Sequence, residues 1–181
     1  MSGSGTNEHG EGLRLVIGAD SAGAHYKDVL RRDLEEDTRV ASVVDIGVDI
    51  DGKTPYPTIA IGAAEMIASG LADRAVLICG TGLGMAMTAN KIPGVRAATA
   101  HDSFSVERSV LSNNSQVLAM GERVVGLEVA RRMVREWLGY RFDPLSASAA
   151  KVRLIEELDS AQSTSRHASA KESEDAQSEP C

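Results

Sequence analysis

Apolar and polar positions follow two alternating periods along the chain, and these predict strands alternating with helices. Short apolar runs rich in β-branched residues are typical of buried strands. They cover residues 13–19, 40–46, 74–79, 96–100 and 116–120. Between them, apolar residues recur at helical spacing, which is typical of helices that bury one face. The predicted helices cover residues 20–37, 57–69, 102–112, 126–140 and 146–160, the last with Ser146 as N-cap.

Short apolar strands that alternate with helices are typical of a parallel sheet covered on both faces. The sequence therefore predicts an α/β fold: a doubly wound, parallel five-stranded sheet with helices on both faces, in the manner of a Rossmann-like sandwich. Binding sites in such sheets lie beyond the carboxyl ends of the strands. The candidate segments there are 20–23, 79–84 and 101–102.

The two ends of the chain lack this pattern. Residues 1–12 are rich in Gly and Ser, and residues 159–181 in Ser, Ala and acidic side chains. Such compositions bury too little apolar surface to fold, so we expect both ends to be disordered. One domain over residues 13–158 remains, which is long enough for a core of its own. Cys181 falls in the tail, where we expect only an exposed thiol.

Composition and charge exclude several classes of function. The chain is 43% hydrophobic and carries a net charge of −7, which argues against nucleic-acid binding. It contains no apolar run of the length that a membrane span needs. The polar N-terminus lacks a signal-peptide core and only two cysteines are present, so we expect a cytoplasmic protein. The four histidines are scattered without metal-ligand spacing, so we expect no metal site.

The stretch CGTGLG, residues 79–84, places a thiol at the start of a glycine-rich loop. It lacks the spacing of a dinucleotide fingerprint and the Gly-Lys-Ser/Thr of a Walker loop. Gly80, Gly82 and Gly84 allow main-chain N–H groups to converge at a helix N-terminus, which forms a cradle for anions. Such dipoles favour a thiolate at Cys79, which can then act as a general base. The residues alone leave open a buried cysteine at the end of a core strand.

Three longer stretches carry a resemblance to a known family. They are VIGADSAG (16–23), CGTGLGMAMTANKIPGVRAA (79–98) and HDSFSVERSVLSNNSQVLAMGERVVGLEVA (101–130). Together they resemble the ribose-5-phosphate isomerase B family, which includes the galactose-6-phosphate isomerase subunits. The resemblance covers residues 13 to about 158. It implies an aldose–ketose isomerase that acts on a small phosphorylated sugar without a cofactor. It also implies a homodimer or a dimer of dimers, with each site shared between two subunits.

The resemblance also implies roles for individual residues. Cys79 is the base that moves a proton between C1 and C2 through a cis-enediolate, and Thr81 relays a proton between the two sugar oxygens. The amides of Gly80, Gly82 and Gly84 form the oxyanion hole. The substrate-binding residues that it implies are Asp20, Ser21, Asn113, Arg123 and Lys151. For His101 with Asp102, an acid–base pair and a plain helix N-cap both remain open.

Several positions depart from the pattern of ribose-5-phosphate isomerases. Ser21 replaces a histidine, and Ser112 replaces the histidine to which ring opening is assigned. Pro55 stands in place of an aspartate, and Ala147 and Lys151 stand where the last helix of the family usually offers two arginines. A tetrose 4-phosphate has its O4 esterified and cannot close into a furanose, so a ring-opening group has no task there. Loss of histidine at 112 therefore favours such a substrate.

The D-erythrulose-4-phosphate isomerases form the subgroup that this chain resembles most, through DSAG and LSNN. We therefore expect D-erythrulose 4-phosphate and D-erythrose 4-phosphate as the preferred pair. Two alternatives stay open: a ribose 5-phosphate/ribulose 5-phosphate isomerase, and a phosphosugar-binding protein without catalysis. Retention of Cys79, Thr81 and the loop glycines favours an enzyme over a binding protein.

Overall fold

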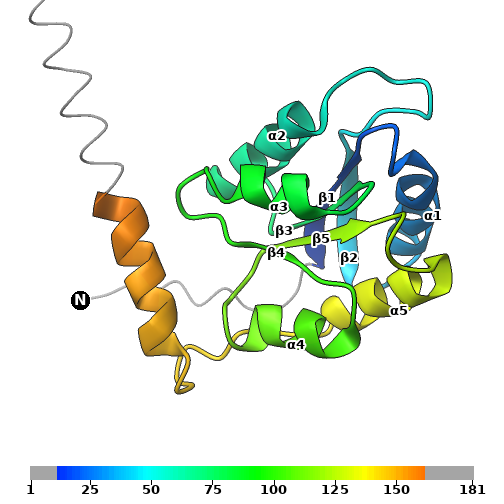
Figure 1. Ribbon diagram of the computed structural model, residues 1–181. Helices are drawn as coiled ribbons and strands as arrows, with labels where there is room; N and C mark the ends of the chain where they lie inside the picture. The colour runs from blue at the N-terminus through cyan, green and yellow to red at the C-terminus, as the bar shows by residue number, and fades with distance from the viewer. Residues whose placement is uncertain (1–11, 162–181) are drawn as a thin grey trace, which may run out of the picture.

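The computed structural model describes residues 12–161 and contains one parallel sheet between two layers of helices (Figure 1). The strands are β1 (Leu13–Ala19), β2 (Val40–Asp45), β3 (Arg74–Cys79), β4 (Ala97–Thr99) and β5 (Val117–Gly121). They lie in the order β2-β1-β3-β5-β4, and every neighbouring pair is parallel. The predicted fold class is confirmed. Cys181 and most of the two predicted disordered ends lie outside the described residues.

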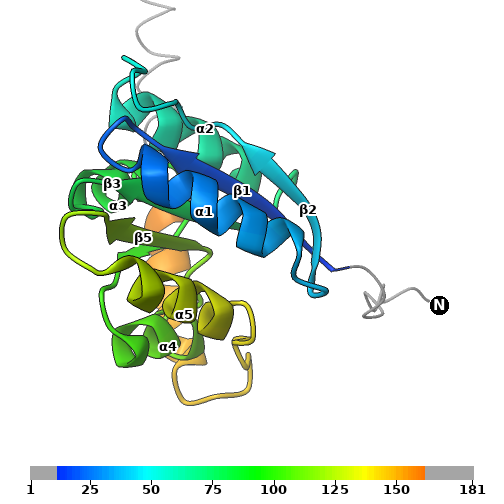
Figure 2. The same cartoon turned by 90° about the vertical axis from the view of Figure 1, so that its right-hand side faces the viewer.

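Helices cover both faces of the sheet (Figures 1 and 2). They are α1 (Ala24–Glu35), α2 (Tyr56–Ala68), α3 (Leu83–Ala89), α4 (Ser103–Leu111) and α5 (Leu127–Trp137), followed by a helix over 149–161. Alternate side chains of β3 divide between the layers. Val76 and Ile78 pack with α1, α4 and α5, whereas Leu77 and Cys79 pack with α2 and α3. This alternation sends the thiol towards the α2/α3 layer.

The last helix begins later than the sequence predicts. Consecutive turns occupy the chain before residue 149, and the carbonyl of Ser148 accepts the first helical N–H groups, from Lys151 and Val152. The prediction that Ser146 caps the helix is wrong, because its own carbonyl closes a turn with Ala149. The helix continues to residue 161, beyond the predicted domain end at 158.

This last helix lies beside the amino end of β4. Glu156 pairs with Arg96 at 3.4 Å, and the Asp159 carboxylate accepts a hydrogen bond of 3.0 Å from the Gly94 N–H. Ala149 and Val152 are buried against the domain. In contrast, Leu154, Ile155 and Leu158 are exposed. Within residues 12–161, no helix combines the length and apolar character that crossing a membrane requires.

Candidate active site

The thiol lies where the strand order of the sheet reverses. β1 has β2 on one side and β3 on the other, so the carboxyl ends of β1 and β3 border the crevice in which doubly wound folds bind ligands. Cys79 is the last residue of β3, and Asp20 follows β1 directly. The paired register of Ala19 with Ile78 brings these two ends together. Two of the three segments proposed from the sequence therefore meet here.

Cys79 is 6% exposed, and its sulfur accepts a hydrogen bond of 3.1 Å from the N–H of Gly82. This bond requires Gly82 to adopt a left-handed conformation, with φ at +78°. A Cβ at this position would also lie 2.8 Å from the main chain of Met120, so a side chain has no room. Glycine is thus required for the loop to direct an amide at the sulfur. The loop therefore brings a main-chain donor directly to the sulfur.

The carbonyl groups of the loop are held by the ends of two neighbouring strands. The N–H groups of Glu122 and Arg123, which follow β5, donate to the carbonyls of Cys79 at 2.9 Å and Gly80 at 3.1 Å. Thr99 at the end of β4 donates its hydroxyl to the carbonyl of Gly82 at 3.3 Å. Because the carbonyls are occupied in this way, the loop keeps one main-chain conformation around the thiol. Thr99 was not identified from the sequence.

Thr81 and Gly84 lie on the outer side of this loop. Thr81 is exposed, and its hydroxyl accepts a long hydrogen bond of 3.4 Å from the Leu83 N–H. Gly84 lies in the first turn of α3, against the ring of Tyr56 at the start of α2. A Cβ on Gly84 would be 2.5 Å from the Tyr56 ring. The aromatic ring therefore borders the loop, and its close approach explains the third glycine of the motif.

Arg123 supplies a cation beside the loop. Its guanidinium lies against Gly80, where a Cβ would be 3.6 Å from Nη1. Arg123 is exposed, and the ion pairs formed within residues 12–161 do not include it. A guanidinium without a carboxylate partner, next to main-chain N–H groups, is suited to an anionic group such as a phosphate.

Asp20 and Ser21 lie half-buried in the loop after β1. The Asp20 carboxylate accepts a hydrogen bond of 3.0 Å from the Ala22 N–H, which closes a local turn rather than capping α1. Gly23 is the N-cap of α1, so Asp20 does not cap this helix. The Glu122 carboxylate instead accepts from the Tyr26 N–H at 3.1 Å and covers this helix end. Sequence reasoning missed Glu122, because 96 positions separate it from Tyr26.

Two of the expected substrate-binding residues are not brought to the thiol within this chain. Asn113 follows α4 and precedes β5, so it lies at the amino edge of the sheet, opposite to Cys79. Its amide donates to the Arg108 carbonyl at 3.2 Å. Lys151 is exposed on the last helix, which contacts the domain at the amino end of β4.

His101 and Asp102 do not form an acid–base pair. The Asp102 carboxylate accepts from the Ser105 N–H at 2.7 Å and caps α4, and hydrogen bonding by Ser105 lowers the pKa of Asp102. His101 turns to β5, where its Nε2 accepts from the Gly121 N–H at 3.1 Å. The N-cap interpretation of Asp102 is therefore confirmed.

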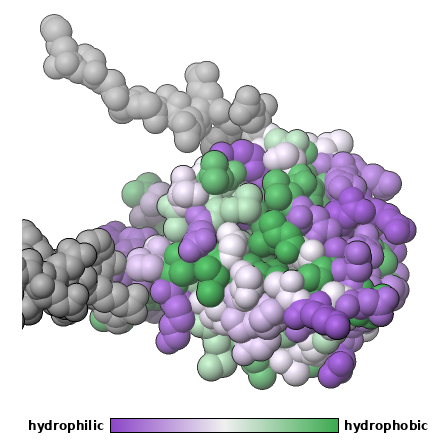
Figure 3. Space-filling model, turned by 90° about the horizontal axis from the view of Figure 1, so that it is seen from above, coloured by the Kyte–Doolittle hydropathy of each residue, from purple (hydrophilic) through white to green (hydrophobic). Residues whose placement is uncertain are grey.

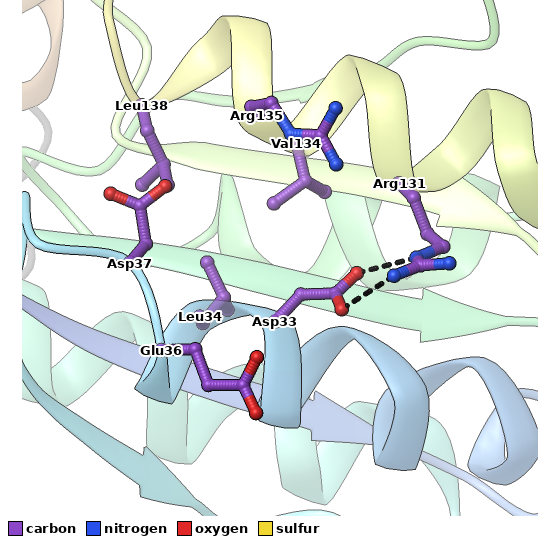
Figure 4. Close-up of a pocket in the computed structure, with 8 residues that line it drawn as sticks. All are labelled: Asp33, Leu34, Glu36, Asp37, Arg131, Val134, Arg135 and Leu138. Carbon is purple, nitrogen blue, oxygen red and sulfur yellow. Dashed lines mark hydrogen bonds and ion pairs between the residues drawn. The ribbon is translucent and has the colours of Figure 1, made fainter.

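A separate pocket of about 260 Å³ lies between the carboxyl-terminal half of α1 and α5 (Figure 4). Three of its charged side chains, Asp33, Asp37 and Arg131, are matched by partners, whereas Glu36 and Arg135 form no ion pair within residues 12–161. Arg131 holds Asp33 through two hydrogen bonds of 2.6 and 2.8 Å, which raises the pKa of Arg131. Asp37 pairs with Arg39, whose hydrogen bonds lower the pKa of Asp37 to about 2. This pocket contains none of the residues expected from the sequence.

A doubly wound parallel sheet with a thiol and a glycine loop at its switch point is the arrangement in which α/β proteins bind small ligands. Comparison with known proteins identifies the particular family. The sequence profile described as Ribose/Galactose Isomerase matches residues 15–155. The chain belongs to this family and is a sugar-phosphate isomerase.

Two relatives and one solved structure illustrate the similarity. The chain is 67% identical over 144 residues to D-erythrulose-4-phosphate isomerase 2 of Mycolicibacterium smegmatis, covering 79% of this chain and 95% of that protein. It is 41% identical over 144 residues to the D-erythrulose-4-phosphate isomerase of Pectobacterium atrosepticum, covering 79% and 93%. The ribose-5-phosphate isomerase B structure of Clostridium thermocellum superposes with a TM-score of 0.78 at 35% identity, covering 83% of this chain and 99% of that one.

Proposed function

We propose that this protein interconverts D-erythrulose 4-phosphate and D-erythrose 4-phosphate, with Cys79 as the base. The observation that carries the proposal is the hydrogen bond of 3.1 Å from the Gly82 N–H to the Cys79 sulfur, at the switch point of the sheet. A thiolate held there by a main-chain donor needs no cofactor to remove a proton next to a carbonyl. The proposed compartment is the cytoplasm.

The proposed reaction balances within the substrate and two side chains. The Cys79 thiolate removes a proton from C1 of the ketose, and the released electron pair forms the double bond of a cis-enediolate. The negative charge on O2 is stabilised by main-chain N–H groups of Gly80, Gly82 and Gly84. Thr81, which is exposed beside them, relays the O1 proton to O2. The thiol then returns its proton to C2, and C1 becomes the aldehyde carbon.

Phosphate and hydroxyl binding are assigned to residues around the same loop. Arg123 lies next to Gly80 and is proposed to hold the phosphate, with Asp20 and Ser21 on the neighbouring strand end. Ser112 supports the choice of a tetrose phosphate, because an open-chain substrate needs no ring-opening histidine. The names of the two D-erythrulose-4-phosphate isomerase relatives support the same choice.

We further propose that a second copy of the chain completes each site. Asn113 and Lys151 lie at the amino edge of the sheet, so they reach a thiol only if it belongs to another subunit. Exposed apolar side chains offer contact surface for such a copy: Leu83 and Met87 on α3 and Leu154, Ile155 and Leu158 on the last helix. Apolar surface also gathers near the middle of the face on the α2 side (Figure 3). Exposed apolar patches of this kind are typical of subunit interfaces.

The substrate assignment is tested by a panel of tetrose, pentose and hexose phosphates followed by NMR in D₂O. We expect D-erythrulose 4-phosphate to be converted with the highest kcat/KM. Equal or faster conversion of ribulose 5-phosphate would overturn this assignment while leaving the isomerase class intact. Binding of a phosphosugar without any conversion would favour the non-catalytic alternative.

The role of the thiol is tested with Cys79→Ala. Removal of a general base costs about 10²–10⁴-fold in rate, so we expect kcat to fall by about 10³-fold and the exchange of the substrate C–H proton to stop. Phosphosugar binding should change by less than about threefold. Cys181→Ala, which alters the other cysteine of the chain, is the control and should retain full activity. Retained exchange in Cys79→Ala would remove Cys79 from the role of base.

The shared site is tested by mixing two inactive variants, Cys79→Ala and Asn113→Ala. Random reassortment of subunits gives one intact site in every mixed dimer, so about a quarter of the wild-type activity should return. A mixture that stays inactive after verified subunit exchange would contradict a site shared in this way.

A further inference from the structure

The imidazole of His101 is bound to the main chain at the carboxyl edge of the sheet. His101 lies two residues beyond β4, and its Nε2 accepts a hydrogen bond of 3.1 Å from the N–H of Gly121, the last residue of β5. A ring nitrogen that accepts a hydrogen bond carries no proton. We therefore assign the neutral tautomer with its proton on Nδ1.

This hydrogen bond extends the pairing of β4 with β5 beyond the end of the shorter strand. β4 contains three residues, and the ladder begins with the Val117 N–H donating to the Arg96 carbonyl at 3.2 Å. Continued in the same register, the ladder would give the Gly121 N–H the carbonyl of Ala100. The His101 side chain provides the acceptor instead. It therefore replaces a main-chain hydrogen bond that a longer β4 would form with β5.

Gly121 lies directly on the loop that carries the thiol. A Cβ on Gly121 would be 2.6 Å from the Thr81 Cα and 2.9 Å from the Gly80 carbonyl oxygen. The two amides that follow Gly121 donate to the carbonyls of Cys79 and Gly80. A shift of the Gly121 main chain therefore moves the residues that hold the base and the amides beside it.

We propose that His101 is a positioning residue for isomerisation: its unprotonated Nε2 fixes Gly121, and Gly121 fixes the Cys79–Thr81 loop. The inference rests on the proposed function, because that function makes Cys79 the base. The hydrogen bond between His101 and Gly121 does not depend on it. His101 does not touch the reacting atoms in this arrangement. Its Nε2 is occupied by the Gly121 amide, and Asp102 is occupied by Ser105, so neither is available to the other as an acid–base partner.

The test compares His101→Gln with His101→Leu. The Gln side chain presents a carbonyl oxygen near the position of Nε2, whereas Leu offers no acceptor. A displacement of about 1 Å at a catalytic group costs up to about 10²-fold, so we expect kcat to fall between about 10- and 100-fold in His101→Leu with KM changed less than threefold. His101→Gln should recover kcat to within about threefold of the wild type.

Amide hydrogen exchange at Gly121 supplies a readout that is independent of activity. We expect exchange at this amide to be faster in His101→Leu and close to the wild-type rate in His101→Gln, with equal melting temperatures for the two variants. His167→Leu is the control, because His167 belongs to the tail that the sequence predicts to be disordered. It should leave both kcat and the Gly121 exchange rate unchanged.

Three results would overturn the proposal: a wild-type kcat in His101→Leu, an equal loss in both His101 variants, or unchanged exchange at Gly121. An equal loss with normal Gly121 exchange in the Gln variant would instead indicate direct proton transfer by the imidazole. The experiment with Cys79→Ala tests the proposed function separately. If Cys79 is not the base, Cys79→Ala stays active, whereas the effect of His101→Leu on hydrogen exchange at the Gly121 amide is still expected.

Discussion

Arginine side chains lie both at the carboxyl edge of the sheet and in the pocket between α1 and α5. Arg123 at the edge and Arg131 in the pocket differ in whether a carboxylate of the same chain pairs with them. In the pocket, Arg131 is held by Asp33 through two hydrogen bonds (Figure 4). The Asp37 carboxylate accepts from Arg39, which lies two residues further along the chain. At the carboxyl edge, Arg123 lies on Gly80 with no ion-pair partner among the described residues. The matched Asp33–Arg131 pair joins α1 to α5. A cation left unmatched beside glycine amides is suited to hold an anion from outside.

Among the variants that test this comparison, Gly82→Ala is expected to have the largest effect. Gly82 has φ at +78°, and a Cβ there would lie 2.8 Å from the Met120 main chain, so the loop must move and the amide leaves the sulfur. We expect kcat to fall by at least about 10²-fold. Steady-state kinetics together with urea unfolding measure the change.

Gly94→Ala is the matched control for this variant. Gly94 has nearly the same φ, +81°, but nothing lies within 4 Å of a Cβ built on it. Its substitution should cost about 1 kcal/mol in the free energy of unfolding and leave kcat unchanged. If both variants lose activity equally, backbone conformation alone explains the effect, and the contact at Gly82 has no special role.

The next effect concerns the unmatched arginine. Arg123→Gln keeps hydrogen-bonding capacity but removes the charge, so we expect KM for the phosphorylated substrate to rise by about 10- to 100-fold with a smaller change in kcat. Arg131→Gln, which breaks the pair with Asp33, should leave KM unchanged and lower the stability of the fold only slightly, because solvent screens this pair. An unchanged KM in Arg123→Gln would remove this residue from phosphate binding.

The smallest effect is a pH dependence of stability from the pocket. Arg39 lowers the pKa of Asp37 from 3.8 to about 2, so the folded protein binds this proton more weakly than the unfolded chain does. The stabilisation is therefore complete above about pH 4 and is lost as the pH falls towards 2. We expect Asp37→Asn to be less stable than the wild type by about 1 kcal/mol at pH 7, a value typical of solvent-screened pairs.

Urea unfolding of both proteins at pH 7, 4 and 2.5 measures this difference. It should shrink at the lowest pH, because the wild-type carboxylate is then partly protonated. A difference that stays constant over this range would show that the pair does not contribute through its charge. Activity at pH 7 should be equal in the two proteins, since this pocket is separate from the proposed site.

The strands and the loop were predictable because their signals are local. The apolar run at 74–79 matches β3 to the residue, and the Cys-Gly-Thr-Gly spacing indicated the thiol loop. The start of the last helix was not predictable from Ser146, since the turns before residue 149 delay it. Contacts between distant segments left no local pattern either. The His101–Gly121 bond and the Glu122–Tyr26 bond join residues 20 and 96 positions apart.

The low exposure of Cys79 determines which reagents reach its sulfur. A thiol that is 6% exposed admits small oxidants such as hydrogen peroxide more readily than bulky alkylating agents. Modification by a large reagent requires the surrounding segment to open, so its rate in the native protein reports the frequency of that local opening. Saturating sugar phosphate should slow this labelling, which offers a way to follow occupancy without observing turnover.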